Sequence, residues 1–388
     1  MYKPTKTKLS ENSYTILNTI RQNTGGEFMS MTPLVQNTDD LKDYGLYVTG
    51  GGNSIETFMN ALANRIISVE SYIKSYENQL RVFKRGKLEY GETIENVWTN
   101  LVDPEGYTSH TDTPGDVYKQ NIPEALVTFH PVNSRLVYET TTSDADLSTA
   151  FLSASGVNSL ISKIVTQLYN SAEWDEYIMF KYVIARAILA NANSTVTAAA
   201  ALTKDSSNDL VSSFREYSNN LQFMDTNYNP AGVATVSKTD DQICLISSKA
   251  SAIIDVNSLA AAFNLSYRDF LGQRVLVNRF DFTEGEHARL VKMMNENVAK
   301  GTIPEWTDFT EEEKKKLAAI NGAIIDRDFF MIFDRLYQSN AIYDELHLST
   351  NTRLHTWKIY SYNPFANCVF FADPLVAGQS TKTNKATV

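Results

Sequence analysis

The chain has 388 residues, 43% hydrophobic and 21% charged, which excludes a disordered or fibrous protein and favours two lobes over a single core. Its 45 acidic and 35 basic residues give a net charge of −10. This charge argues against a main role in binding nucleic acid or an anionic membrane, because either partner requires a basic surface. Two cysteines, Cys244 and Cys368, are too few for a disulfide framework. Without a signal peptide or an apolar run approaching about 18 residues, the sequence predicts a soluble protein made inside the cell.

Residues 1–52 have few regularly spaced apolar positions and end in Gly50, Gly51 and Gly52. We therefore predict an extended N-terminal arm over 1–52, with the three glycines as its hinge. The glycines are not a phosphate-binding loop, because Asn53-Ser54 follows where that loop needs Lys and then Ser or Thr. Asn53 and Glu56 have the spacing of a helix cap, and the apolar residues after them predict a first helix over about 54–70.

Two long elements follow the first helix. Residues 79–142 contain β-branched and aromatic runs separated by Gly and Pro, so we predict β-arms with an irregular tip and assign an extended β-loop to 79–125. Residues 157–201 contain neither Pro nor Gly, and their apolar stripe predicts a spine helix over 157–190. Because the polar residues 203–240 mark a lobe boundary, we place the first helix, the β-loop and the spine helix in one domain, 53–202.

Residues 203–350 alternate predicted helices and strands and form a second domain. Helices are expected over 207–221 and 254–264, and strands at QICLIS and RVLVNRF. Capping boxes at Thr283 with Glu286 and at Thr310 with Glu313 predict two more helices, the second ending at Asn321-Gly322. Residues 351–373 are predicted strands that return to the body, and 374–388 a polar tail.

Candidate catalytic and metal-binding residues are scattered. The five histidines lie in separate predicted elements, and only the last two share a neighbourhood, so we expect structural roles for His110, His130, His287, His347 and His355. Asp326 and Asp328 would share one face of a strand, either as a paired acid and base or as an edge ion-paired with Arg327. Capping and the helix dipole account for Glu284 and Glu286. The sequence predicts no enzymatic activity, no metal and no cofactor.

The β-loop carries a basic segment followed by an acidic one. The bases are Arg81, Lys84, Arg85 and Lys87, and the acids are Glu89, Glu92 and Glu95. One interpretation is an edge strand that uses charge against aggregation. The other is an arm that docks on a neighbouring copy, with these seven residues as candidate contacts between subunits. Composition alone leaves both open.

The order of elements resembles the major capsid proteins of tailed phages, which have the Hong Kong 97 fold. Three segments are similar to capsid proteins of small short-tailed phages of Gram-positive hosts. They are AIIDRDFFMIFDRLYQSNAIYDE (323–345), LHTWKIYSYNPFANCVFF (354–371) and QICLISSKASAIIDVNSLAAAFN (242–264). The resemblance implies an α+β fold with an N-terminal arm, an extended β-loop, a spine helix in a peripheral domain, and an α/β apical domain at 203–350.

The resemblance also implies a function. Many copies would form hexamers and pentamers of an icosahedral head around double-stranded DNA, with the β-loop over an adjacent subunit and the arm lacing capsomers together. The implied partners are a separate scaffolding protein, a portal protein at one vertex, and packaged DNA held weakly, with no membrane. The protein would be made in the host cytoplasm and located in the virion. The alternatives are a cell-wall or polysaccharide hydrolase using Asp326 and Asp328, and a tail or baseplate structural protein.

Overall fold

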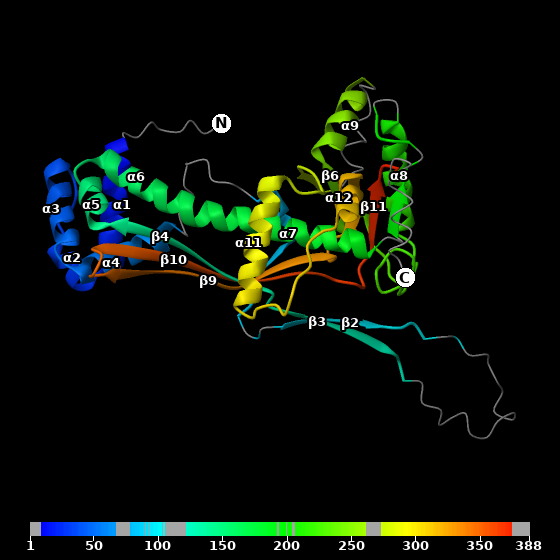
Figure 1. Cartoon of the computed structure of the whole chain (residues 1–388), viewed down its shortest axis with the longest axis horizontal. Coiled ribbons are helices and arrows are strands. Elements are labelled where there is room, and N and C mark those ends of the chain that lie inside the picture. The colour runs from blue at the N-terminus through cyan, green and yellow to red at the C-terminus, as the bar shows by residue number, and fades with distance from the viewer. Residues whose placement is uncertain are drawn as a thin grey trace. The chain divides into compact units, whose positions relative to one another are not determined.

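The computed structural model describes residues 9–66, 78–89, 91, 93–102, 104, 122–191, 194–198, 200–203, 206–260 and 273–374 (Figure 1). The chain divides into two compact units. Unit 1 contains Met1–Asn78, Ser134–Glu176 and Asp334–Trp357, and unit 2 contains Gln79–Asn133, Tyr177–Phe333 and Lys358–Val388. This division differs from the predicted domains, because 79–133 and 177–202 belong to unit 2 and 334–350 to unit 1.

The first described segment of unit 1 is helical, so the prediction of an extended arm over 1–52 is wrong for residues 9–52. It forms α1 (Leu9–Thr24), α2 (Gly26–Met31) and α3 (Thr38–Thr49), and α4 (Gly52–Ile66) follows. These helices share an apolar core with α5 (Asp144–Ala150) and α6 (Ala154–Ile164). The core includes Leu17, Ile20, Leu41, Tyr44, Val48, Phe58, Phe151 and Leu160. Burial of these side chains stabilises the helices, because removing apolar surface from water is favourable.

The three glycines join two packed helices, which corrects the prediction of a hinge between an arm and the body. Gly50 caps the end of α3 in a right-handed helical conformation, with φ −76°. Gly51 separates the helices, and Gly52 begins α4. Because α3 and α4 contact each other within one core, the short break sets a turn between them.

The spine helix is confirmed. The chain is helical through α6, a π-helical segment (Val165–Asn170) and α7 (Ser171–Ala190). The predicted apolar stripe is buried at Val157, Leu160, Ile164 and Leu168. In α7 almost every side chain from 175 to 188 is buried or half-buried, which explains why YIMFKYVIARAILA is apolar nearly throughout.

Two long strands near the end of the chain were expected from their apolar pattern. β9 (Phe330–Asp344) and β10 (Ser349–Tyr362) lie in a four-stranded sheet of order β1-β9-β10-β4, with β1 (Lys84–Lys87) and β4 (Ser134–Ser143) at its edges. Buried and half-buried residues alternate along most of β10, as in a strand with one covered face. Arg353 on β10 pairs with Glu139 on β4 at 3.0 Å.

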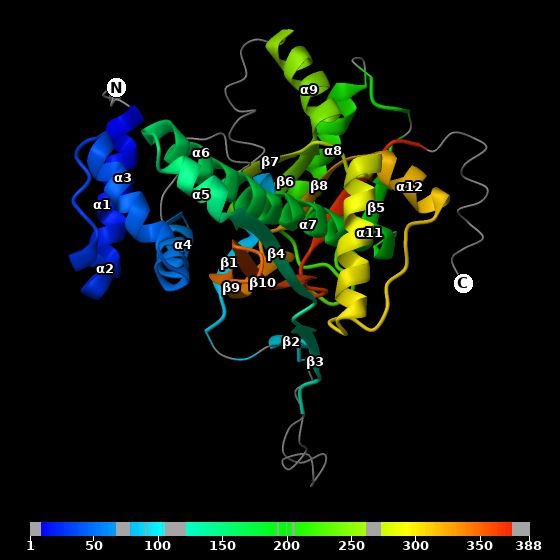
Figure 2. The same ribbon diagram turned by 60° about the vertical axis from the view of Figure 1, so that its left-hand side comes forward.

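Unit 2 is built on a five-stranded sheet of order β5-β11-β8-β6-β7. The strands are β5 (Thr195–Thr197), β6 (Gln242–Ser247), β7 (Gln273–Val277), β8 (Ile320–Asp326) and β11 (Cys368–Ala372). β8 is antiparallel to both β6 and β11, whereas the outer pairs, β5 with β11 and β6 with β7, are parallel. The helices α8 (Ser207–Asn220) and α9 (Ser248–Ala260) contact this sheet (Figure 2). Phe214 on α8 packs on Phe371 with ring centroids 4.3 Å apart.

Both predicted capping boxes are confirmed, at the starts of α11 (Glu284–Ala299) and α12 (Glu311–Ala318). The predicted end of the second helix at Asn321-Gly322 is wrong, because α12 ends at Ala318 and these two residues lie in β8. A Cβ atom at Gly322 would lie 2.8 Å from both the carbonyl oxygen of Leu245 and the ring of Phe214. The glycine is therefore required by close packing in the sheet, not by a helix end.

Several expectations fall outside the described residues. These are positions 1–8 of the arm, 67–70 of the first helix, most of the β-loop tip with Glu92 and His110, 261–264 of a helix, and nearly all of the tail. Two short 3-10 helices, Gln79–Phe83 and Thr239–Asp241, complete the described elements. No helix in the described part of the chain is both long and apolar enough to cross a membrane.

Candidate assembly surface

β2 (Thr93–Thr99) lies in the predicted β-loop and pairs with β3 (Ala125–Pro131) to form a two-stranded ribbon (Figure 1). The predicted end of the loop at residue 125 is therefore too early, because β3 begins there, and the β-loop is taken below as residues 79–131. The strands are antiparallel, with Glu95 opposite Phe129 and Val97 opposite Val127. Since side chains alternate between faces along a strand, these four residues share one face. That face is open: Phe129 is 62% exposed and Val97 57% exposed. Two aliphatic residues and one aromatic residue therefore lie together in solvent, and we call them the ribbon strip: Val97, Val127 and Phe129.

The opposite face of the ribbon is attached to the rest of unit 2 by polar contacts. The indole of Trp98 donates to the carbonyl of Ala234, with 3.4 Å between nitrogen and oxygen. His130 is buried, with Nε2 3.1 Å from the amide nitrogen of Asn96 and Nδ1 2.6 Å from the hydroxyl of Ser361. Because the amide nitrogen of Asn96 can only donate, Nε2 accepts, and Nδ1 carries the proton and donates to Ser361. Burial lowers the pKa of His130, which favours this neutral form.

The structure separates the four predicted bases of the loop. Arg85 is bound within its own unit, since its guanidinium pairs with the Asp328 carboxylate and donates to the carbonyl of Arg327 at 2.7 Å. Lys84 is half-buried. Arg81 and Lys87 are exposed and have no ion-pair partner among the described residues.

The described acids of the loop, Glu89 and Glu95, are also exposed, and neither pairs with a base in the described part of the chain. Glu95 lies on the same ribbon face as Phe129. The predicted basic and acidic segments are thus both available at the surface, while Arg85 is already committed inside the subunit.

Asp326 and Asp328 do not share a strand face, which corrects the sequence prediction. Asp326 is the last residue of β8, and Asp328 lies in the turn before β9. The backbone N–H of Asp328 donates to Asp326 at 2.8 Å, and the hydroxyl of Ser237 donates to the other carboxylate oxygen. Burial raises the pKa of Asp326. Both carboxylates thus fix the turn, Asp328 through its ion pair with Arg85.

The remaining predicted site residues have separate partners. His287 lies 2.8 Å from Asp308, His347 lies 2.8 Å from Asp344, and His355 contacts Asn340 at 3.2 Å. No group of three or more potential metal ligands occurs among the residues that the structure describes. Cys244 and Cys368 are free and buried, and burial raises the pKa of the Cys244 thiol to about 12.

Sequence reasoning missed a buried ion pair in unit 2. Lys181 on α7 is 1% exposed, and its ammonium lies 3.0 Å from the carboxylate of Glu286, the capping residue of α11. Asn278 contacts both groups, at 3.2 Å from the Lys181 ammonium and 3.1 Å from the Glu286 carboxylate. The capping box identified Glu286 in the sequence. The available signal for its partner was Lys181 itself, a charged residue inside the apolar run of α7.

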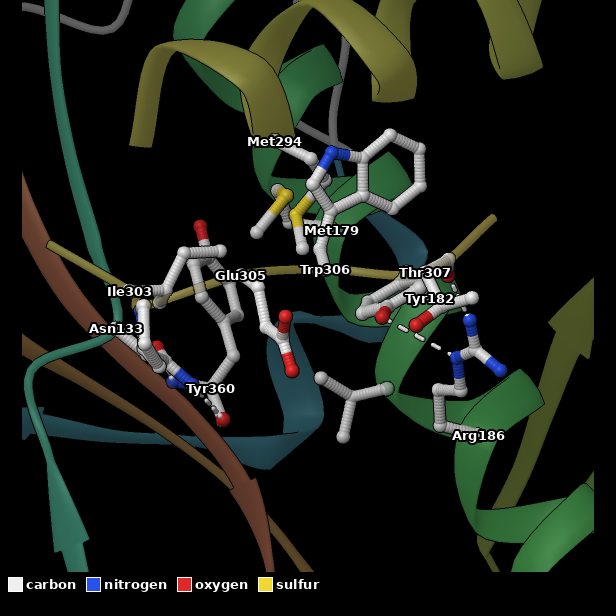
Figure 3. Close-up of a pocket in the computed structure, with 12 residues that line it drawn as sticks. Asn133, Met179, Tyr182, Arg186, Met294, Ile303, Glu305, Trp306, Thr307 and Tyr360 are labelled. Atoms are coloured by element: carbon white, nitrogen blue, oxygen red, sulfur yellow. Dashed lines mark hydrogen bonds between the residues drawn. The ribbon is translucent and has the colours of Figure 1, made fainter. Parts of the chain in front are cut away.

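Sequence reasoning also missed a cavity of about 480 Å³ in unit 2, between α7, α11 and the loop 303–307 (Figure 3). Aromatic and aliphatic side chains form part of its walls, and polar groups, including those of Asn133, Arg186, Glu305 and Thr307, form the rest. The walls are formed by Asn133, Met179, Tyr182, Val183, Arg186, Met294, Ile303, Pro304, Glu305, Trp306, Thr307 and Tyr360. These residues come from five separate segments, so no local pattern could have predicted the cavity.

Comparisons with known sequences converge on one group of proteins. Residues 17–372 match a family described as Phi29-like phage major capsid protein. A major capsid protein of Bacillus phage GA-1 is 28% identical over 365 residues, which cover 93% of this chain and 69% of the relative. A major capsid protein of Streptococcus phage Cp-1 is 25% identical over 292 residues, covering 70% of this chain and 77% of the relative.

Solved structures show a similar fold. A chain in the capsid structure of Staphylococcus phage Andhra has a TM-score of 0.58 at 12% identity, covering 79% of this chain and 89% of that chain. A chain in the structure of the head fiber and inner core protein gp22 of bacteriophage P68 has a TM-score of 0.57 at 14% identity. The match covers 79% of this chain and 88% of that chain.

Proposed function

Since the chain belongs to the family of Phi29-like phage major capsid proteins, we propose that its copies assemble through the β-loop into hexamers and pentamers of an icosahedral head that encloses double-stranded DNA. Membership confirms the resemblance found in the sequence, including the mixed α+β capsid fold, and makes the chain a structural component of the virion. The alternatives of a hydrolase and of a tail or baseplate protein are not supported, because the curated relatives are major capsid proteins.

The ribbon strip is the observation that carries the assembly proposal. An isolated two-stranded ribbon is at best marginally stable in water, and a contiguous apolar patch on it marks a surface that another molecule covers. The β2–β3 ribbon keeps Val97, Val127 and Phe129 in solvent while its other face is held to unit 2. A neighbouring copy that covers this face would bury the apolar side chains.

The exposed charges support the same surface. Glu95 on the ribbon, and Arg81, Lys87 and Glu89 in the segment before it, have no ion-pair partners among the described residues, so they are free to pair across an interface. Exposed ion pairs are worth about 0.2–1 kcal/mol each, so they set orientation more than affinity. We infer that apolar burial supplies most of the binding energy and the charges supply the register.

The remaining partners follow from the same proposal. A scaffolding protein would guide assembly, and a portal protein would occupy one vertex. With a net charge of −10, the shell would hold its DNA weakly and without sequence preference, because tight binding needs many bases to displace counterions. Lacing of capsomers by residues 9–52 is not part of the proposal, because these residues are packed helices.

Electron microscopy of the expressed chain, with its scaffolding partner, tests the proposal. The parent should form closed shells, and Val97→Asp with Phe129→Asp should remain folded but fail to form them. Leu152→Asp, at a residue 61% exposed in unit 1, is the matched control and should assemble like the parent. Normal shells from the double variant would contradict assembly through the ribbon.

A further inference from the structure

We propose that the cavity lined by Tyr182, Glu305 and Trp306 receives the side chain of Lys87 from the β-loop of a second copy. This inference rests on the proposed function, since it requires that copies associate through the β-loop. It adds a receiving site on the neighbour and a specific ion pair, Lys87 with Glu305.

The cavity suits a side chain with an apolar stem. Met179 and Met294 are buried in its wall, and Trp306 offers an aromatic face (Figure 3). The ring of Tyr182 already carries the guanidinium of Arg186, 5.3 Å from its centroid. A lysine stem of four methylenes packs well on such surfaces while its ammonium reaches a polar rim. An ammonium near the face of the Trp306 ring is also attracted by it.

Glu305 supplies the charge that selects a cation. It is the single acidic residue of the lining and is exposed. Figure 3 shows its carboxylate between Tyr360 on one side and Tyr182 on the other. Among the residues that the structure describes, Glu305 has neither an ion pair nor a hydrogen bond of its side chain, so its charge is free to bind a ligand.

The other polar groups of the cavity are already engaged. Arg186 donates to the hydroxyl of Tyr182 at 3.2 Å and to the carbonyl of Thr307, and it lies 3.5 Å from Glu313. The indole of Trp306 donates to Asn295 at 2.9 Å. The amide of Asn133 bonds the backbone of Tyr360. An incoming group therefore meets one free carboxylate, that of Glu305, beside a guanidinium that is held by its own partners.

Lys87 is the base best placed to leave its own subunit. Arg85 is paired with Asp328, and Arg81 lies in a 3-10 helix fixed by buried Leu80 and Phe83. Lys87 ends β1, is exposed, and follows Gly86, whose φ of 117° is open to glycine alone without strain. Lys87 and Glu305 belong to the same unit and do not pair with each other within it, so both charges are available to a second copy.

A cross-linking experiment tests the contact directly. Two single variants, Lys87→Cys and Glu305→Cys, are mixed during assembly and treated with a short bis-maleimide, because a Lys–Glu contact holds the backbones too far apart for a disulfide. We expect a covalent dimer that requires both variants. The buried native thiols, Cys244 and Cys368, give little background. Glu296→Cys, an exposed acid on α11 outside the cavity, replaces Glu305→Cys in the control.

Charge exchange provides a second, independent measurement. Lys87→Glu or Glu305→Lys alone should weaken association about fivefold, and the two together should restore it to within twofold of the parent. Closed shells without the specific cross-link, or an additive loss in the double variant, would overturn the Lys87–Glu305 contact. Failure of the parent chain itself to form shells would instead overturn the proposed function.

Discussion

Two regions of the chain present aromatic residues in opposite ways. In α4, Phe58 is 1% exposed, and its ring lies 5.4 Å from that of Phe151 between centroids. On the ribbon, Phe129 is 62% exposed, and Val127 on the same face is 42% exposed. The first region completes its core inside one subunit, whereas the second leaves apolar surface for another molecule. If copies assemble through the ribbon as proposed, stability of the subunit and stability of the shell depend on different residues of the same type.

A matched pair of substitutions gives the largest contrast. Phe58→Ala should destabilise the subunit by about 3–5 kcal/mol, because it leaves a cavity in a closed core. Phe129→Ala should change the unfolding free energy by less than about 0.5 kcal/mol but reduce shell formation. Denaturant unfolding and electron microscopy measure the two effects. Equal destabilisation by both substitutions would remove the distinction between the regions.

Two lysines extend the comparison to charged groups. Lys181 is buried against Glu286, whereas Lys87 is exposed. Lys181→Met should cost about 3–5 kcal/mol, because the Glu286 carboxylate is left buried without its partner. Lys87→Met should leave the unfolding free energy nearly unchanged. Unfolding curves for both variants check this, and a Lys181→Met subunit as stable as the parent would show that the pair does not hold α7 to α11.

The exposed bases should have a smaller effect that depends on salt. Arg81→Glu together with Lys87→Glu should leave the subunit folded and weaken assembly by about 0.2–1 kcal/mol for each lost pair. Because salt screens exposed charges, the deficit should shrink as ionic strength rises. Arg85 is kept unchanged, since its reversal would also break the ion pair with Asp328. Light scattering at low and high salt measures the difference in assembly. Unaltered assembly of the double variant at low salt would mean that these charges only protect an exposed edge strand from aggregation.

His130 offers the smallest effect, a pH dependence of the ribbon's attachment. Its pKa is lowered from the ordinary value of 6.5 by burial, so the folded state binds the proton less readily than the unfolded state. Its contribution to stability is therefore full above pH 6.5 and is lost as the pH falls below that value. His130→Gln should remove this part of the pH slope. Unfolding of both proteins from pH 7.5 to pH 5 checks it, and identical slopes would exclude His130 as the cause.

Local signals in the sequence predicted the fold well. The capping boxes at Thr283 and Thr310 involve residues three apart, so each is readable without the rest of the structure. α3 was missed although it has the same kind of signal, a capping box of Asn37 with Asp40. Its buried residues Leu41, Tyr44 and Val48 have helical spacing, but polar neighbours dilute the stripe.

The candidate surface was less predictable because it depends on distant contacts. Arg85 meets Asp328 across more than 240 positions of sequence, and this pairing separates one base from the others of the loop. The β-branched and aromatic run that includes TIENVWT predicted β-structure, but only the register with β3 shows that Val97, Val127 and Phe129 share an exposed face. The cavity around Glu305 likewise needs α7, α11 and β10 to be brought together by folding.

Hydrogen exchange in the free subunit and in assembled shells tests the central claim most directly. If a neighbour covers the ribbon, backbone amides of residues 93–99 and 125–131 should exchange far more slowly in the shell than in the subunit, because local opening is suppressed by the covering copy. Amides of α4 around Phe58, already protected by their own core, should change little. Equal exchange of the ribbon in both states would contradict the account, since the exposed strip would then remain uncovered in the assembled head.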